Sequence, residues 1–247
     1  MADDLSTNCQ ISDRTECLKR QSGDVHGGNK TKINKRLIDD ICKSSEQECI
    51  EIKQNENMVK KSDVIDVVYR YFSEDIGLTE IELQEIQMNP SSIKIVKSID
   101  KLSSFLEKRY KQIVNNDEQS KLLVICGSAR RCIYYKESLH SLWRLNRLQW
   151  TFAFSKHKSF SKQSSDLKNS ANKPISIAFG TPTRVRQLID NNVINILSGH
   201  RLFIVLDWTY RDVKLRTMTD MIELKKDLCE LIKTCVKQCA QAKYLIV

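Results

Sequence analysis

The sequence predicts an α/β fold in which one parallel sheet is flanked by helices on both faces. Apolar runs of about five residues, typical of buried strands, recur from position 121 onward and alternate with helical stretches. The spacing between these runs leaves room for the covering helix that a parallel connection requires. Apolar residues make up 40% of the chain and charged residues 29%, which fits a soluble globular protein.

The first 120 residues precede this sheet. Residues 1–60 contain no aromatic residue and are rich in Ser, Asn, Asp, Lys and Gln, so we expect a disordered tail. We expect residues 61–120 to form a helical extension. An apolar helix face begins at Val64, and Thr79 with Glu82 has the pattern of a capping box at the start of a second helix. A third helix is expected from Ser98 to Val114.

Residues 121–247 carry the alternation itself and are expected to form the sheet domain. The predicted strands cover residues 122–126, 149–154, 175–179 and 202–206, and an apolar, strand-like run closes the chain at 243–247. The predicted helices cover residues 129–145, 182–190 and 219–241. The Lys- and Ser-rich residues 155–173 are expected to form a connection.

The positive charge is concentrated after the tail. Residues 1–60 carry 10 Lys or Arg against 11 Asp or Glu, so the remaining 30 basic and 20 acidic residues give 61–247 an excess of +10. Such an excess favours a polyanionic partner, of which RNA is the obvious one. A surface that is merely rich in lysine explains the charge alone about equally well.

The cysteines and the hydropathy pattern exclude other classes. The nine cysteines are scattered without a CxxC pair, which favours buried thiols in a reducing compartment over disulfides or a metal site. No apolar run is long enough for a membrane span, and the first thirty residues lack the apolar core of a signal peptide. We therefore expect no metal and no membrane.

Three strands end in polar segments, at Gly127–Arg131, Gly180–Arg184 and Asp207–Arg211. Ligands of parallel sheets gather at the carboxyl ends of the strands. The order and spacing of the three segments resemble the first RecA-like domain of DEAD-box RNA helicases. In that family, the first two segments bind the RNA backbone and the third, D-E-A-D, serves ATP.

The departures from the helicase pattern predict a degenerate domain. A phosphate-binding loop needs GxxxxGK[ST], because small residues let backbone N–H groups wrap the phosphates, and none of the seven glycines starts this pattern. Trp208 stands where D-E-A-D has its glutamate, and nothing after the closing KYLIV supplies the S-A-T motif or a second helicase domain. We expect no bound nucleotide, no cofactor and no enzymatic activity.

Several strings resemble a narrower family, the helicase-like subunits of the small-subunit processome. They are LLVICGSARR, FSKHKSFSKQ, FGTPTRVRQLI and VLDWTYRDVKLRTMTDMIELKKDLCELI. The resemblance as a whole covers roughly residues 63–247. The hallmark D-W-x-x-R-D-x-K-x-R begins at Asp207. The resemblance implies a nucleolar, non-catalytic factor of early pre-ribosomes containing the U3 small nucleolar RNA. Pre-rRNA or small nucleolar RNA and pre-ribosomal proteins would be its partners.

The first two strand ends supply the candidate RNA-binding residues. Thr181 and Pro182 are typical of a helix start, and free N–H groups there can also hold a phosphate. Two arginines at the start of a helix oppose its dipole, which an anionic partner would relieve. The cluster around His157 is a solvated loop or a weaker phosphate site. The candidates are Arg130, Arg131, Lys156, Lys158, Thr181, Thr183, Arg184 and Arg186.

The hallmark string supplies the candidate docking residues, which are Trp208, Tyr210, Arg211, Lys214 and Arg216. One interpretation is self-contained: the aromatic residues fill the vacated nucleotide cleft, and Asp212 pairs with its basic neighbours. The other is a surface that docks a partner protein or RNA. We favour filling for Trp208, whose indole covers a large apolar area, and docking for the three basic residues.

The leading functional prediction is RNA and protein binding during early small-subunit ribosome assembly and pre-rRNA processing. One alternative is an ATPase or RNA helicase whose site is completed by a partner chain. Another is a scaffold that binds only proteins. The sequence leaves open which RNA segment and which neighbour are contacted.

Overall fold

The computed structural model describes residues 59–114, 121–145, 149–155, 158–169, 175–196, 201–239 and 241–247. The expected disordered tail, except for its last two residues, lies outside the described residues. Residues 54–247 form one compact unit.

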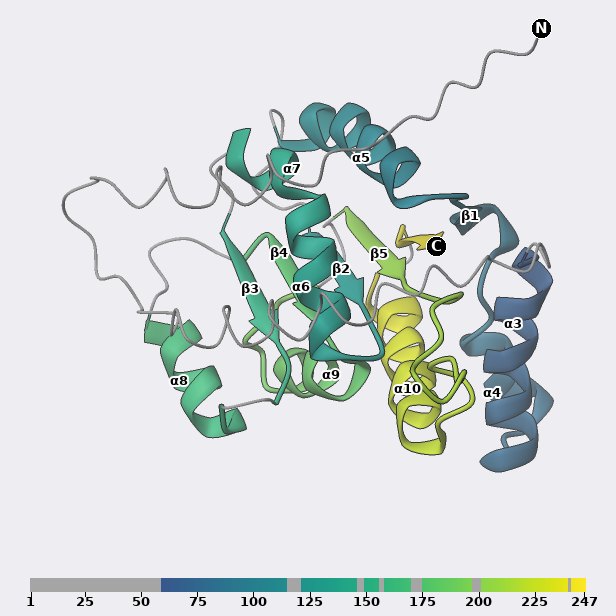
Figure 1. The fold of residues 1–247 in the computed structure, drawn as a ribbon. Coiled ribbons are helices and arrows are strands. Elements are labelled where there is room, and N and C mark those ends of the chain that lie inside the picture. The colour runs from purple at the N-terminus through teal and green to yellow at the C-terminus, as the bar shows by residue number, and fades with distance from the viewer. Residues whose placement is uncertain are drawn as a thin grey trace, which may run out of the picture. The chain divides into compact units, whose positions relative to one another are not determined.

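The unit is built around a six-stranded sheet with the order β1-β6-β5-β2-β4-β3. Every neighbouring pair is parallel, which confirms the predicted fold class. The strands are β1 (Ile93–Ile95), β2 (Lys121–Ile125), β3 (Trp150–Ala153), β4 (Ile177–Gly180), β5 (Leu202–Leu206) and β6 (Lys243–Ile246). Figure 1 shows the arrowheads of β2, β3 and β5 at one edge of the sheet, here named the carboxyl edge.

Helices cover both faces. They are α3 (Lys61–Arg70), which continues into the π-helical turn η1 (Tyr71–Asp75), α4 (Glu80–Glu85), α5 (Ile99–Val114), α6 (Ala129–Ser138), α7 (His140–Leu145), α8 (Phe160–Asn169), α9 (Pro182–Asp190) and α10 (Ile222–Gln238). A short 3₁₀ turn, η2 (Pro90–Ser92), leads into β1. Among the described residues, none of these helices is long and apolar enough to cross a membrane.

The core has two layers because successive side chains of a strand point to opposite faces. Leu123 and Ile125 of β2 belong to the layer that includes α3, α9 and α10. Leu122 and Val124 belong to the layer that includes α5 and α6. All five residues of β2 are buried, as expected for a central strand covered on both sides.

Three elements differ from the sequence-based expectation. Residues 61–120 were expected to be helical, but Ile93–Ile95 form β1, which pairs with the C-terminal strand β6. The helix expected over 129–145 is interrupted at Leu139, the C-cap of α6. The expected connection 155–173 contains α8. This polar segment forms a helix because one of its faces packs against the core. Gln163 and Ser164 are buried on that face, and Phe160 and Leu167 contact the core.

Candidate site at the carboxyl edge

The structure brings the three polar strand ends together. Strand β2 lies between β4 and β5, and its last residue, Ile125, is in register with Gly180 and Leu206. The amide of Cys126 donates to the carbonyl of Gly180 at 2.9 Å, and the amide of Asp207 donates to that of Ile125 at 3.0 Å. The segments that follow these strands therefore start side by side at the carboxyl edge.

Gly180 allows the strands to meet this closely. A Cβ atom on Gly180 would lie under 3.0 Å from the carbonyl oxygen of Ala153 in β3 and from Cγ2 of Val185 in α9. Both neighbours are held in regular structure, so neither has room to move aside. Glycine at this strand end is a packing requirement, and the next residues can turn directly into α9.

Asp207, the acid that ends β5, is bound by the protein itself. Its side chain is 1% exposed and accepts two hydrogen bonds from Arg131, from Nε to Oδ2 at 2.8 Å and from Nη2 to Oδ1 at 2.7 Å. The hydroxyl of Tyr135 donates a third bond to Oδ1 at 3.0 Å. Both carboxylate oxygens are thus occupied by α6, and an ion pair neutralises the buried charge.

Three aromatic rings surround the Arg131 guanidinium. Its central carbon lies 4.3 Å from the ring centroid of Tyr210, 4.7 Å from Tyr134 and 5.3 Å from Tyr135. Burial alone would lower the pKa of Arg131, but the hydrogen bonds and charge of Asp207 outweigh it and raise that pKa. Burial, and then the negative charge of Asp207, also raise the pKa of Tyr135, so its hydroxyl remains a donor.

Trp208 is part of the core. Its side chain is only 8% exposed and belongs to the layer formed by α3, α9 and α10. Its amide donates to the carbonyl of Val247 at 2.9 Å, which fixes the chain beside the end of β6. The structure therefore agrees with the space-filling interpretation of Trp208 and contradicts its inclusion among the docking residues, because a buried indole has no surface to offer.

The remaining docking candidates lie in a loop that Asp212 organises. Asp212 Oδ1 accepts the amides of Lys214 at 2.8 Å and Arg216 at 2.9 Å, and Oδ2 accepts the Arg216 guanidinium. Leu215 adopts a left-handed conformation with φ of 60°, and its carbonyl accepts a bond from Arg211. The bond to the Arg216 side chain lowers the pKa of Asp212.

This loop, residues 209–216, keeps its basic side chains at the surface. Arg211, Lys214 and Arg216 are all exposed, and so are the apolar side chains of Val213 and Leu215. The contact between Tyr210 and Arg131 places the loop against the start of α6. A further bond holds the start of the loop, since the amide of Thr209 donates to the carbonyl of Val247 at 3.1 Å.

The start of α9 is bonded mainly within the protein. Thr181 is the N-cap residue, as expected, but its hydroxyl makes no capping bond. The hydroxyl of Thr183 donates to Asp227 of α10, and Arg186 donates to the same carboxylate at 2.8 Å. Arg184 is 7% exposed and donates to Oε1 of Gln163 in α8 at 3.0 Å. Arg184 was predicted to bind RNA, but α8 covers its side chain in this structure.

The other predicted RNA-binding residues have different surroundings. Arg130 is exposed at the second position of α6. Lys158 forms an ion pair with Asp166 at 2.7 Å, in which both side chains are about one-third exposed. Lys156 and His157 lie outside the described residues. Tyr135, Gln163 and Asp227 could not be predicted as bonding partners. Each lies in a helix, and the residues next to it in the sequence do not indicate which distant side chain it contacts.

The pairing of Arg131 with Asp207 defines a class of α/β domain in which the protein's own arginine holds the acid at the end of a strand. Among the described residues, no group of three or more His, Cys, Asp or Glu could hold a metal ion. The sequence model of the CMS1 family, described as a U3-containing 90S pre-ribosomal complex subunit, matches residues 12–244. The chain belongs to this family, and the match begins well before residue 63, where the resemblance was expected to start.

The curated relatives carry the name Protein CMSS1. The one from Xenopus laevis is 32% identical over 161 residues, covering 62% of this chain and 55% of the relative. The human protein is 29% identical over 160 residues, with the same coverage. The Danio rerio protein is 29% identical over 177 residues, covering 69% and 58%. The chain spans little more than half the length of the curated relatives it matches.

Two solved structures match this chain at low identity and with TM-scores under 0.5. One is a Saccharomyces cerevisiae Dbp5 variant bound to Nup159, a Gle1 variant, IP6 and ADP, with a TM-score of 0.42, 11% identity and coverage of 73% of this chain and 45% of that chain. The other is the C-terminal part of the Fun30 ATPase domain, with a TM-score of 0.37, 12% identity and coverage of 99% and 73%.

Proposed function

We propose that the chain is a non-catalytic RNA- and protein-binding factor that assembles the early small-subunit pre-ribosome and supports pre-rRNA processing in the nucleolus. Membership of a family described as a subunit of the U3-containing 90S pre-ribosomal complex supports this proposal. Pre-rRNA or small nucleolar RNA and pre-ribosomal proteins are the proposed partners. The excess of basic residues after position 60 is consistent with an RNA-rich surrounding.

The observation that carries the non-catalytic part is the pairing of Asp207 with Arg131. A carboxylate at this strand end would hold Mg²⁺ in an ATPase. Here, Arg131 and Tyr135 occupy both oxygens, and the guanidinium supplies the positive charge that a metal would bring. No segment of the chain has the sequence of a phosphate-wrapping loop, since none of its seven glycines starts the pattern GxxxxGK[ST].

A nucleotide-binding assay tests this part. We expect no saturable binding of a fluorescent ATP analogue with Mg²⁺ at micromolar protein concentrations, and no difference between wild type and Asp207→Asn. The same assay with purified pre-ribosomal particles tests the alternative that a partner chain completes an ATPase site. Saturable binding that Asp207→Asn abolishes, in either setting, would establish the ATPase and end the present proposal.

For RNA, the best-supported contacts are the exposed arginine at the start of α6 and the basic loop beside it. Arg130 lies at the start of α6, and Arg131 joins this helix to Tyr210 in the loop that displays Arg211 and Lys214. Exposed guanidinium and ammonium groups in one area suit a phosphate backbone, without reading of bases. We propose that RNA lies over this part of the carboxyl edge.

An RNA titration at several salt concentrations tests the contacts. Arg130→Ala and Lys214→Ala should each weaken binding to unrelated single strands alike and reduce the slope of affinity against salt by about one unit. Lys243→Ala is the matched control, because Lys243 is exposed at the opposite, amino end of β6. Equal slopes for all four proteins would remove both residues from the proposed RNA site.

A scaffold that binds only proteins is the second candidate, and one observation favours it. Arg131, Arg186 and Lys158 each pair with a carboxylate, and Arg184 is buried against Gln163. Much of the predicted RNA-binding charge is therefore neutralised internally. The titration separates the two candidates: a full chain with no salt-dependent RNA affinity would favour the scaffold.

A further inference from the structure

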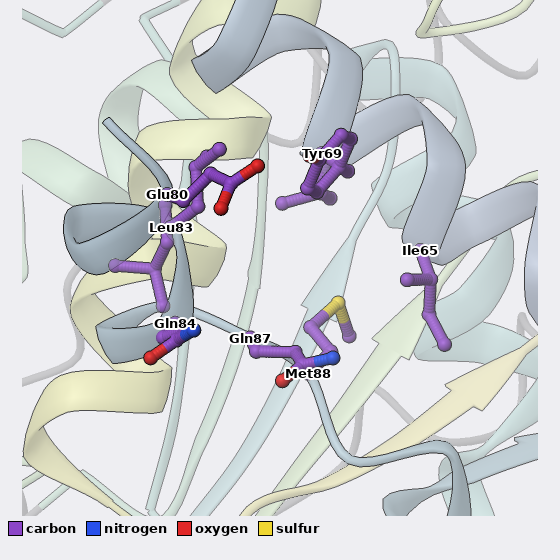
Figure 2. A pocket seen from close by; sticks show the side chains of 9 residues that line it. Ile65, Tyr69, Glu80, Leu83, Gln84, Gln87 and Met88 are labelled. Carbon is purple, nitrogen blue, oxygen red and sulfur yellow. The ribbon is translucent and has the colours of Figure 1, made fainter. Parts of the chain in front are cut away.

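A pocket lies between α3 and α4, away from the carboxyl-edge residues described above. It has a volume of about 280 Å³. Ile65, Val68 and Tyr69 line it from α3, Leu83 and Glu80 from α4, and Ile86 and Met88 from the segment that follows, with Gln84 and Gln87 beside them. Figure 2 shows Tyr69 and Glu80 on opposite sides of the opening, with Met88 between the two helices.

The segment that forms this pocket also exposes apolar side chains. Tyr69, which lines the pocket, is 52% exposed, and Ile76 and Ile81 of the same segment are 47% and 75% exposed. Exposed apolar side chains on a segment that forms a pocket with an apolar floor are typical of protein-binding surfaces. The floor itself is well packed, since Val68, Leu83, Ile86 and Met88 are buried.

The same surface is acidic in a chain that is otherwise basic. Residues 59–92 carry seven Asp or Glu against three Lys or Arg, and all seven carboxylates are exposed. Asp63 and Glu82 accept bonds at helix starts, and Asp75 and Glu85 pair with lysines of α10. Within the described residues, Asp66, Glu74 and Glu80 form no ion pair.

We propose that the α3–α4 surface, meaning the pocket-lining residues together with Ile76 and Ile81, docks a basic amphipathic helix of a protein partner. Apolar side chains on one face of such a helix would enter the pocket beside Tyr69. Its lysines or arginines would meet Glu80 and the other exposed carboxylates of residues 59–92. A helix seated in an apolar groove is a recurrent way of binding peptides. RNA does not fit, since unpaired carboxylates repel phosphates.

Synthetic peptides of stated chemistry test this surface on the full chain. The first is an amphipathic peptide of about 16 residues with leucines at helical spacing and lysines elsewhere. The second keeps the leucines but replaces the lysines with glutamates, and the third keeps the lysines but replaces the leucines with serines. Fluorescence anisotropy should show saturable binding of the first peptide and at least about tenfold weaker binding of the other two.

Variants assign the binding to the pocket. Tyr69→Ala should weaken binding of the first peptide by about tenfold or more, and Glu80→Lys by roughly three- to tenfold. The matched controls are Ile222→Ala and Glu223→Lys, which change an exposed apolar and an exposed acidic residue of α10 outside the pocket. Both controls should bind as wild type does, and thermal unfolding checks that all four variants fold.

Several outcomes would overturn the proposal. They are failure of the first peptide to bind, equal affinity for the lysine and glutamate peptides, and unchanged affinity of Tyr69→Ala. Sedimentation of the full chain tests whether a second copy of the chain occupies the surface. Self-association that Tyr69→Ala abolishes would assign the surface to that second copy. Competition by single-stranded RNA for the Tyr69-dependent site would assign it to nucleic acid.

Discussion

Arg131 and Asp207, 76 residues apart in the sequence, form a two-bond ion pair that ties the start of α6 to the end of β5. The carboxylate is buried and the guanidinium is 21% exposed, between the rings of Tyr134, Tyr135 and Tyr210. The pair lies at the carboxyl edge of the sheet, where the ligands of parallel α/β sheets gather.

Removing one partner of this pair should destabilise the fold. Asp207→Ala leaves the Arg131 charge without its partner and the Tyr135 hydroxyl without an acceptor, so we expect the free energy of unfolding to fall by about 2–4 kcal/mol. Urea denaturation measures it. Arg216→Ala, which removes a more exposed pair with Asp212, should cost less than about 1 kcal/mol. Similar losses for the two variants would contradict a structural role for the buried pair.

Trp208 should contribute to stability through packing. Trp208→Ala removes a buried indole and leaves a cavity between the sheet and its helices, at a cost of about 3–5 kcal/mol in the free energy of unfolding. Tyr69→Ala is the control, because its ring is half exposed and its loss should cost little. Unchanged thermal unfolding of Trp208→Ala would show that the indole is at the surface.

The two glycines at the strand ends should differ in tolerance. Gly180→Ala forces a Cβ against the backbone of Ala153 and should lower the free energy of unfolding by about 1–3 kcal/mol. Gly127→Ala meets only the flexible side chains of Met218 and Met221 and should cost less. Chemical denaturation of both variants compares them, and the reverse order would contradict the close approach of β3 and β4.

The loop held by Asp212 should loosen in acid. Its bonds to Arg216 and Lys214 lower the pKa of Asp212, so they stabilise the folded loop above the ordinary aspartate pKa of 3.8. This contribution is lost as the pH falls through the lowered folded pKa. Amide hydrogen exchange of Lys214 and Arg216, corrected for intrinsic rates, should therefore lose protection at the acid end of a pH series. In Asp212→Asn, protection should be weaker at every pH and independent of this titration.

The buried thiols should resist alkylation. Burial raises the pKa of Cys229 to about 12, and raises those of Cys126, Cys235 and Cys239 as well, so little thiolate forms at neutral pH. Maleimide labelling followed by peptide mapping should leave Cys126, Cys132, Cys229, Cys235 and Cys239 unmodified until denaturant is added. Rapid labelling of Cys229 in the native protein would show that α10 opens readily.

Much of the sheet could be predicted because its signals are local. Residues 122–125 of β2 and all of β5 are continuously apolar, and only a central strand covered on both faces needs that composition. The change from apolar to polar residues at Asp207, directly after β5, indicated where the carboxyl edge lies. Strand β1 could not be predicted, since three residues, Ile93–Ile95, have no period of their own and become a strand only by pairing with β6.

The lack of the pattern GxxxxGK[ST] and the aromatic residue after Asp207 could be read from residue types alone. The bonds that the charged side chains make depend on the fold. Arg131, Arg184 and Arg186 look equivalent in the sequence, yet one pairs with Asp207, one is buried by α8, and one shares Asp227 with Thr183. The reason is physical: a charged side chain bonds to whatever acceptors the fold brings within about 3–4 Å, and these partners lie 21 to 76 residues away.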